Sequence, residues 1–184
     1  MPSRLYLSTL FIFCFSFASS ADDAHPAIKQ AREVKRVTSD VVSELVKLAL
    51  DEADSSGSRE VAIHLLGELR SQDAVEPLLR ILLTRGLVRF ETGPLSAYPA
   101  AQALSSMGSL VYDDAWGRVA REQSDKYLYV LAFTMVQIDG QPIAALRVKE
   151  KLKEVKIDPL KVNLQRLLKV LETTDFKDPN RWPT

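Results

Sequence analysis

Cysteine is almost absent from this sequence, since Cys14 is the only one among 184 residues. It lies in an apolar run near the N-terminus and directly follows Phe13, whereas lipid attachment favours small residues before the cysteine. We therefore expect no lipidation. Because no cysteine follows residue 14, neither a disulfide nor a thiolate zinc site is available to the rest of the chain. Packing alone must stabilise the fold.

Glycine and an excess of either charge are also lacking. Only seven glycines occur, and none belongs to a glycine-rich phosphate loop. The 24 basic and 24 acidic side chains give a formal net charge of zero. Binding to nucleic acid needs a basic surface that neutralises phosphates, so we expect no nucleic-acid partner.

Histidine is nearly absent as well, with two residues in the chain. His64 lies in a line with Glu60 and Glu68 at spacings of four residues, a pattern that places the three side chains on one helix face. Successive helix turns are about 5–6 Å apart, so such a row rarely converges on one ion. We predict a solvated helix face, no metal site and no cofactor.

No nucleophile stands beside a base in a recognisable catalytic pattern. The acidic pair Asp113-Asp114 is the best candidate for acid/base chemistry. Adjacent residues of a helix point in different directions, and acids near a helix start are favoured by the helix dipole. We therefore predict a structural role for this pair, no catalytic residue, and a protein that is not an enzyme.

The first 21 residues have the pattern of a secretory signal peptide. Arg4 supplies a positive charge, residues 5–17 form an apolar run, and Ser19-Ser20-Ala21 offers small residues before Asp22. The 13 residues of that run are too few to span a bilayer core of about 30 Å as a helix. We expect cleavage, export to the periplasm or cell exterior, and no membrane insertion afterwards. A retained N-terminal anchor is the alternative.

The rest of the chain has the apolar spacing of successive amphipathic helices. Residues 33–50 carry an apolar stripe at spacings of three and four, and no strand-type alternation occurs. Residues 59–69 and 74–83 predict two helices joined by a short turn. Pro77 lies in the first turn of the second helix, where proline is tolerated. The two helices predict an antiparallel hairpin.

The hairpin resembles a HEAT-like repeat of the subtype also found in bilin-lyase-type proteins. The resemblance lies in four features: Leu66-Gly67 near the end of the first helix, Ala74-Val75 opening the second, and Leu78 and Leu82 along it. Two weaker copies follow when Leu104 and Met135 are aligned with Leu66, at spacings of 38 and 31 residues. The match covers roughly residues 55–154.

This resemblance implies an all-α fold, a short right-handed α-solenoid of about three HEAT-like helical hairpins with helical caps. A single hairpin cannot bury both apolar faces, so neighbouring hairpins stack around a shared core. We expect a signal peptide at 1–21, an N-terminal helical cap at 22–54, HEAT-like repeats at 55–154, and a C-terminal cap helix with a loose tail at 155–184. The cap helix is expected at 159–171.

Three cations occupy the same position in the second helix of the aligned copies, namely Arg80, Arg118 and Lys149. The resemblance places second helices along the concave face, where these side chains would form a basic ladder. Such a ladder suits an acidic peptide or protein surface.

Another explanation of the first two cations is local. Glu76 and Asp114 lie four residues before Arg80 and Arg118, so each pair can simply support its own helix. Lys149 has Ala145 at the corresponding position, and this explanation fails there. The sequence leaves both readings open.

A long segment, residues 86–96, separates the first two copies and makes the first spacing longer. Extra residues in repeat proteins often form loops on the binding face. Phe90 within the segment and Tyr98 after it are therefore candidate partner-binding residues.

Aromatic residues gather in the next part of the chain. Trp116 replaces a leucine of the first copy, so we predict a core position for it. Tyr127 and Tyr129 are predicted to be surface anchors. In the C-terminal tail, Phe176 and Trp182 are candidates for docking onto the last helix.

These observations favour a non-catalytic exported repeat scaffold that binds a protein or peptide partner through its concave surface. An enzyme or accessory factor related to bilin-lyase-type HEAT proteins is one alternative, although a shared fold does not fix function. A structural spacer in an envelope assembly is the other.

Overall fold

In the computed structural model, the described residues are 26, 28, 39–53, 57–86, 97–156 and 158–176. Within these ranges all regular structure is helical and no strand occurs, which confirms the all-α prediction. No helix in the described part is long and apolar enough to cross a membrane. The elements are α2 Ser39–Leu50, α3 Ser58–Leu69, the 3-10 turn Gln72–Ala74, α4 Val75–Arg80, α5 Pro99–Met107, the 3-10 turn Gly108–Val111, α6 Tyr112–Val119, α7 Asp125–Asp139, α8 Gln141–Glu154 and α9 Asp158–Thr173.

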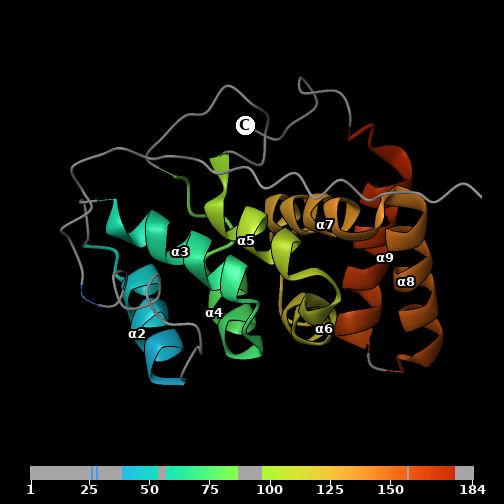
Figure 1. The fold of residues 1–184 in the computed structure, drawn as a ribbon. Coiled ribbons are helices and arrows are strands. Elements are labelled where there is room, and N and C mark those ends of the chain that lie inside the picture. Colours follow the sequence, from blue (N-terminus) through green and yellow to red (C-terminus); the bar gives the residue numbers. More distant parts are fainter. Residues whose placement is uncertain are drawn as a thin grey trace, which may run out of the picture.

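Two rows of helices make up most of the molecule (Figure 1). In the first row α3 packs on α5, and α5 packs on α7. In the second row α4 packs beside α6, while α2 covers α3 at the N-terminal end. This is the packing expected of stacked hairpins that share one core. The α-solenoid arrangement and its handedness stay predictions.

The residues that align the repeat copies lie in the core. Leu66, Leu104 and Met135 are each 0% exposed. Trp116 is also buried, which confirms its predicted core position. The Leu-Gly step of the first copy has a steric cause. A Cβ on Gly67 would lie 2.7 Å from the Cα of Ala103, so glycine lets the backbones of α3 and α5 approach.

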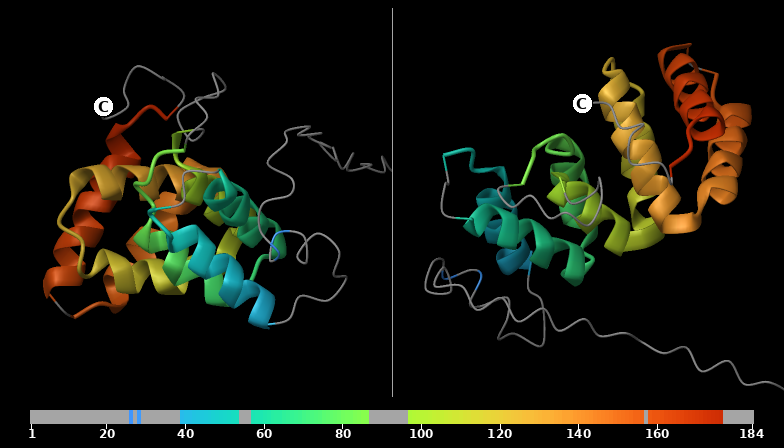
Figure 2. Two further views of the ribbon diagram at one scale, coloured as in Figure 1. Left: turned by 90° about the vertical axis from the view of Figure 1, so that its left-hand side faces the viewer. Right: turned by 90° about the horizontal axis from the view of Figure 1, so that it is seen from above.

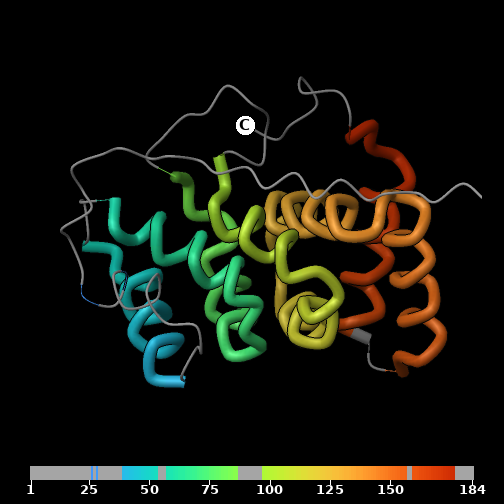
Figure 3. Tube along the Cα trace, in the orientation of Figure 1, coloured from blue at the N-terminus to red at the C-terminus, as the bar shows by residue number. Residues whose placement is uncertain are grey.

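The third hairpin departs from the predicted arrangement. Helix α8 packs on α7 and α9, whereas α6 packs on α4 and α9. The Cα trace shows α9 between α6 and α8 at this end of the molecule (Figure 3), and two further views show α8 and α9 side by side (Figure 2). Helix α9 therefore takes the place beside α6 that the repeat alignment gave to α8.

Local sequence explains why α7 and α8 are separate helices. At the start of α7, the Ser124 side chain accepts a hydrogen bond from the Tyr127 backbone N–H at 3.2 Å, which satisfies one free donor of the first turn. At the end of α7, Gly140 adopts a φ of 81°, a left-handed conformation that side-chain-bearing residues avoid. Pro142 then lies in the first turn of α8.

The end of the described chain folds back onto α7. The ring of Phe176 lies 5.8 Å from the ring of Tyr129 and 5.8 Å from that of Phe133, measured between centroids. We predicted docking of Phe176 onto the last helix, and in the structure its ring contacts are with α7. Trp182, the other predicted docking residue, lies outside the described residues.

Candidate binding surface

The three predicted ladder cations do not form a row. Arg80 is exposed at the end of α4, and no group among the described residues pairs with it. Arg118 lies 5.4 Å from the centroid of the Tyr127 ring and 3.6 Å from the Glu122 carboxylate. Lys149 belongs to α8, which α9 separates from α6. Arg80 and Arg118 therefore lie on two helices that pack together, whereas Lys149 lies apart on α8, and the three equal sequence positions do not give one continuous row.

The local explanation of these cations also fails in the structure. Within the described residues Glu76 makes no ion pair with Arg80. Asp114 accepts a hydrogen bond of 2.7 Å from the Gln72 side chain, and Arg118 pairs with the residue four positions after it. Neither predicted helical pair forms, so the charge of Arg80 is not explained by support of its own helix through such a pair.

Lys149 has a structural partner, because its Nζ lies 2.8 Å from a carboxylate oxygen of Glu172 on α9. Both side chains are about half exposed. Exposed ion pairs of this kind typically contribute about 0–1 kcal/mol. The third member of the predicted ladder thus links two helices at the C-terminal end and lies away from Arg80.

Two of the predicted surface aromatics are buried. Tyr98 is 3% exposed and lies at the start of α5, where its carbonyl oxygen accepts a hydrogen bond from the Ala101 N–H at 3.0 Å. Its predicted partner-binding role is wrong for this structure, because the ring is in the core. Phe90, the other aromatic candidate, lies outside the described residues.

Tyr127 was predicted to be a surface anchor, and this prediction is wrong. The residue is 3% exposed, and its hydroxyl donates a 2.9 Å hydrogen bond to the carbonyl oxygen of Leu79 in α4. Burial raises the pKa of Tyr127 above its ordinary value, although the nearby Arg118 acts in the opposite direction. Tyr127 is therefore a neutral side chain that joins α7 to α4.

An open hollow of about 490 Å³ lies where α6 ends and α9 begins. The residues after α6 form one wall and the first turns of α9 form the other. Its lining comprises Ala120, Arg121, Glu122, Gln123, Pro159, Val162, Asn163 and Arg166. The hollow combines cationic, apolar and amide groups on two segments that are far apart in the sequence.

Side-chain hydrogen bonds fix the two walls of the hollow to each other. Asn163 is 9% exposed, and its Nδ2 donates to the carbonyl oxygens of Val119 at 2.9 Å and Glu122 at 2.7 Å. Val119 is the last residue of α6 and Glu122 follows it, in the region where helix carbonyls lack intrahelical donors. Arg166 donates to the Gln123 carbonyl at 2.9 Å and to Asn163 Oδ1 at 2.7 Å. Neither anchoring residue was predicted from the sequence.

A second polar cluster lies between α6, α7 and α8. The Tyr112 hydroxyl donates to Asp139 at 2.5 Å, Arg147 donates to the same carboxylate at 2.6 Å, and the guanidinium lies 4.6 Å from the Tyr112 ring centroid. Burial raises the pKa of Asp139, but hydrogen bonds from Arg147 and Tyr112 outweigh burial and hold this pKa below its usual value. Burial and the hydrogen bond to Asp139 raise the pKa of Tyr112. Tyr112 and Arg147 both donate hydrogen bonds to Asp139, so the cluster links α6 and α8 to the end of α7.

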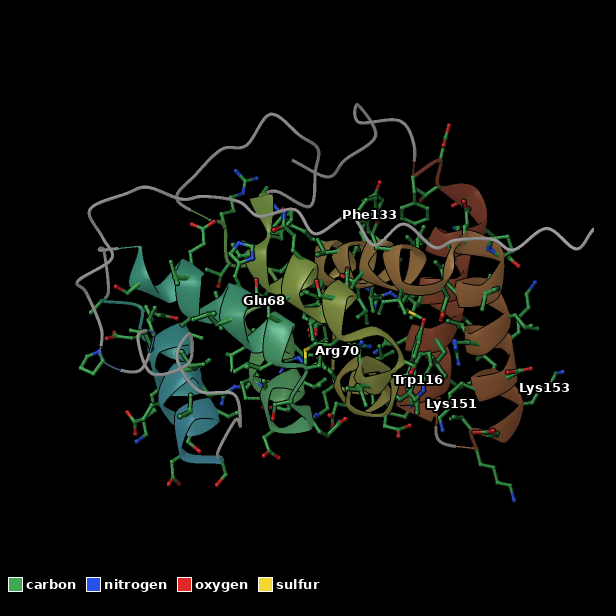
Figure 4. All side chains as sticks on the ribbon, in the orientation of Figure 1. Glu68, Arg70, Trp116, Phe133, Lys151 and Lys153 are labelled. Atoms are coloured by element: carbon green, nitrogen blue, oxygen red, sulfur yellow. The ribbon has the colours of Figure 1, made fainter. Side chains whose placement is uncertain are left out.

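The line of His64, Glu60 and Glu68 stays a helix face in the structure. His64 and Glu68 are exposed on α3, where Figure 4 labels Glu68. No group of three or more metal-binding side chains occurs within the described ranges.

Comparison of the chain with family models, with curated proteins and with solved structures finds no significant match. The HEAT-like resemblance therefore stays a resemblance of sequence pattern.

Proposed function

We propose that this protein is a non-catalytic, exported binding scaffold that holds a protein or peptide partner through its second helix row, formed by α4, α6 and α9. The observation that carries the proposal is the pair of exposed arginines, Arg80 at the end of α4 and Arg121 just after α6. Within the described residues Arg80 has no bonding partner, and Arg121 makes only a 3.3 Å hydrogen bond from Nε to the Gly117 carbonyl.

The arginines lie at the ends of two helices that pack against each other. Cations at helix C-termini are also favoured by the helix dipole, typically by about 0.3–1 kcal/mol. That local effect acts on folding stability alone. A role in binding instead predicts that both charges act on affinity and on its dependence on salt.

The test is a pull-down from the exported fraction of the native host, with the purified chain as bait. We expect a partner that binds the wild-type chain and is lost from the double variant R80E/R121E. Charge reversal changes the local charge by four units, so association is expected to respond most strongly at low salt. Thermal unfolding of each bait must show that the variant is folded.

The matched control is the double variant K153E/K156E, which makes the same change of charge at exposed lysines near the end of α8, outside the second helix row. Lys153 projects from the outer side of α8 (Figure 4). We expect the control to retain the partner. The proposal fails if no protein is captured, or if a captured protein binds R80E/R121E and wild type equally. A spacer that docks through another face would show this second result.

A further inference from the structure

The hollow between α6 and α9 is lined by two arginines that differ in their partners. Arg166 is surrounded by acceptors, including an Asp125 carboxylate oxygen 2.6 Å from its guanidinium. Arg121, on the opposite wall, keeps its terminal guanidinium nitrogens without a partner among the described residues. Those nitrogens present a planar pair of donors that matches the two oxygens of a carboxylate.

The acidic side chain of the lining does not neutralise Arg121. Glu122 is 12% exposed, and its carboxylate accepts from the backbone N–H groups of Gln123 at 3.0 Å and Ser124 at 2.9 Å. Its second oxygen faces Arg118 at 3.6 Å. The carboxylate is therefore engaged within its own loop, and the lining of two arginines and one glutamate has one net positive charge.

Beside this cation lies an exposed apolar surface. Val162 is 53% exposed, the most exposed large apolar side chain in the described part of the chain, and it lines the hollow together with Pro159. A partner that covers Val162 gains about 25 cal/mol for each Å² of apolar surface removed from water. A purely anionic ligand would leave this surface in contact with water.

The walls are held in place before any ligand binds. Asn163 and Arg166 connect α9 to the segment after α6 through four hydrogen bonds to that segment and to each other. Leu164 and Leu167, on the core side of α9, are 0% exposed. A fixed site loses little conformational freedom on binding, which favours affinity. The hollow is open, so it suits one or two side chains of a larger partner better than an enclosed small molecule.

Resting on the function proposed above, we infer that this hollow receives an acidic segment of a protein partner. A carboxylate of that segment pairs with Arg121, and a neighbouring apolar side chain covers Val162 and Pro159. The partner is thus defined by an acidic residue next to an apolar one, and charge complementarity selects it over a basic segment.

The test uses three blocked tripeptides as probes and the full chain, labelled with nitrogen-15, as recovered from an exporting host. N-acetyl-Leu-Glu-Leu-amide carries both recognised groups. Replacement of its glutamate by glutamine removes the charge, and replacement of both leucines by serine removes the apolar groups. Amide chemical shifts are followed during each titration. We expect the shifts to concentrate at residues 120–123 and 159–166 with the first peptide.

Because an exposed charge pair contributes up to about 1 kcal/mol, the Glu peptide should bind about three- to fivefold more tightly than the Gln peptide at low salt. R121Q should abolish that preference, and V162S should abolish the preference for leucine over serine. K153Q, a loss of charge on α8, should change neither. Shifts elsewhere on the protein, or preferences that persist in R121Q and V162S, overturn the inference.

The two proposals fail in different ways. One outcome is that a captured partner depends on Arg80 and Arg121 while the tripeptides show no preference that depends on Arg121. This outcome refutes the site for an acidic segment and still supports the scaffold proposal. Tripeptides that bind in the hollow while no captured protein responds to R80E/R121E refute the scaffold instead.

Discussion

The contact between Gly67 of α3 and Ala103 of α5 leads to a prediction with a calculable sign. A methyl group on residue 67 would lie 2.7 Å from Ala103 Cα, 2.9 Å from its Cβ and 3.1 Å from its carbonyl oxygen. Two of these three atoms belong to the backbone, so no change of rotamer relieves the clash. Helix α5 also packs on α7, and any shift of α5 away from α3 therefore disturbs a second interface.

Two opposing effects decide the stability of G67A. Glycine in a helix interior is less favourable than alanine by about 1 kcal/mol, so the substitution gains that amount from propensity. Overpacking a well-packed core typically costs about 1–3 kcal/mol, and the backbone contact places this site in the upper half of that range. We expect a net loss of about 1–2 kcal/mol in the free energy of unfolding. For a chain of this size the loss lowers the Tm by about 2–8 °C.

Gly117 supplies the matched control, because it lies in α6 and a Cβ there would meet no atom within 4 Å. G117A should gain the higher helix propensity of alanine without a steric clash, and it should raise the free energy of unfolding by up to about 1 kcal/mol. Both variants are measured by urea denaturation followed by circular dichroism, with the Tm as a second readout. If G67A is as stable as wild type, or is stabilised as G117A is, close helix contact does not explain the glycine of the first repeat.

Two further predictions concern acid stability and export. The pKa of Asp139 is held low in the folded state, so its stabilising effect is present above its unfolded pKa of about 3.9 and disappears as pH falls through the folded pKa. D139N should therefore lower the free energy of unfolding by about 1–2 kcal/mol at pH 7, because its bonds to Arg147 are weaker, and in urea denaturation it should approach wild type below about pH 4. The control is D125N, which should change stability little because the Asp125 carboxylate is 91% exposed. A loss of stability in D139N that is constant with pH contradicts the linkage. For export, mass spectrometry of the full chain expressed in a bacterium should find protein outside the cytoplasm that begins at Asp22, whereas a retained N-terminus indicates an uncleaved anchor.

Local sequence was sufficient to predict the first helix of the first hairpin and the last helix of the described chain. The predicted helix at 59–69 corresponds to α3, Ser58–Leu69, and the predicted helix at 159–171 corresponds to α9, Asp158–Thr173. Apolar spacing carries this information, since it depends only on which residues share a helix face. The second helix of the hairpin is shorter than the predicted 74–83 at both ends, because Ala74 belongs to a 3-10 turn and residues 81–83 form a turn after α4.

The neighbours of each helix were harder to predict, because packing between distant segments leaves a weak local signal. The burial of Tyr98 and Tyr127 depends on contacts with other helices, and composition alone does not separate a buried tyrosine from an exposed one. Asn163 did leave a signal. It lies three residues after Leu160 and four before Leu167, so a polar amide interrupts the apolar stripe of α9. Such a residue in a buried stripe predicts a hydrogen-bonding partner across an interface.

The packing of α9 against α6 accounts both for the departure from a regular repeat and for the hollow that forms the candidate site. In a regular stack, α8 would lie beside α6, and successive hairpins would close the space between their second helices. Here α9 packs against α6 instead, and it needs Asn163 and Arg166 to bond to the carbonyls that follow α6. Arg121 lies in that same connection and lines the hollow, and its terminal guanidinium nitrogens have no partner among the described residues. The strongest candidate for recognition is therefore found where the repeat pattern ends, and substitutions at Arg121 should affect binding far more than folding.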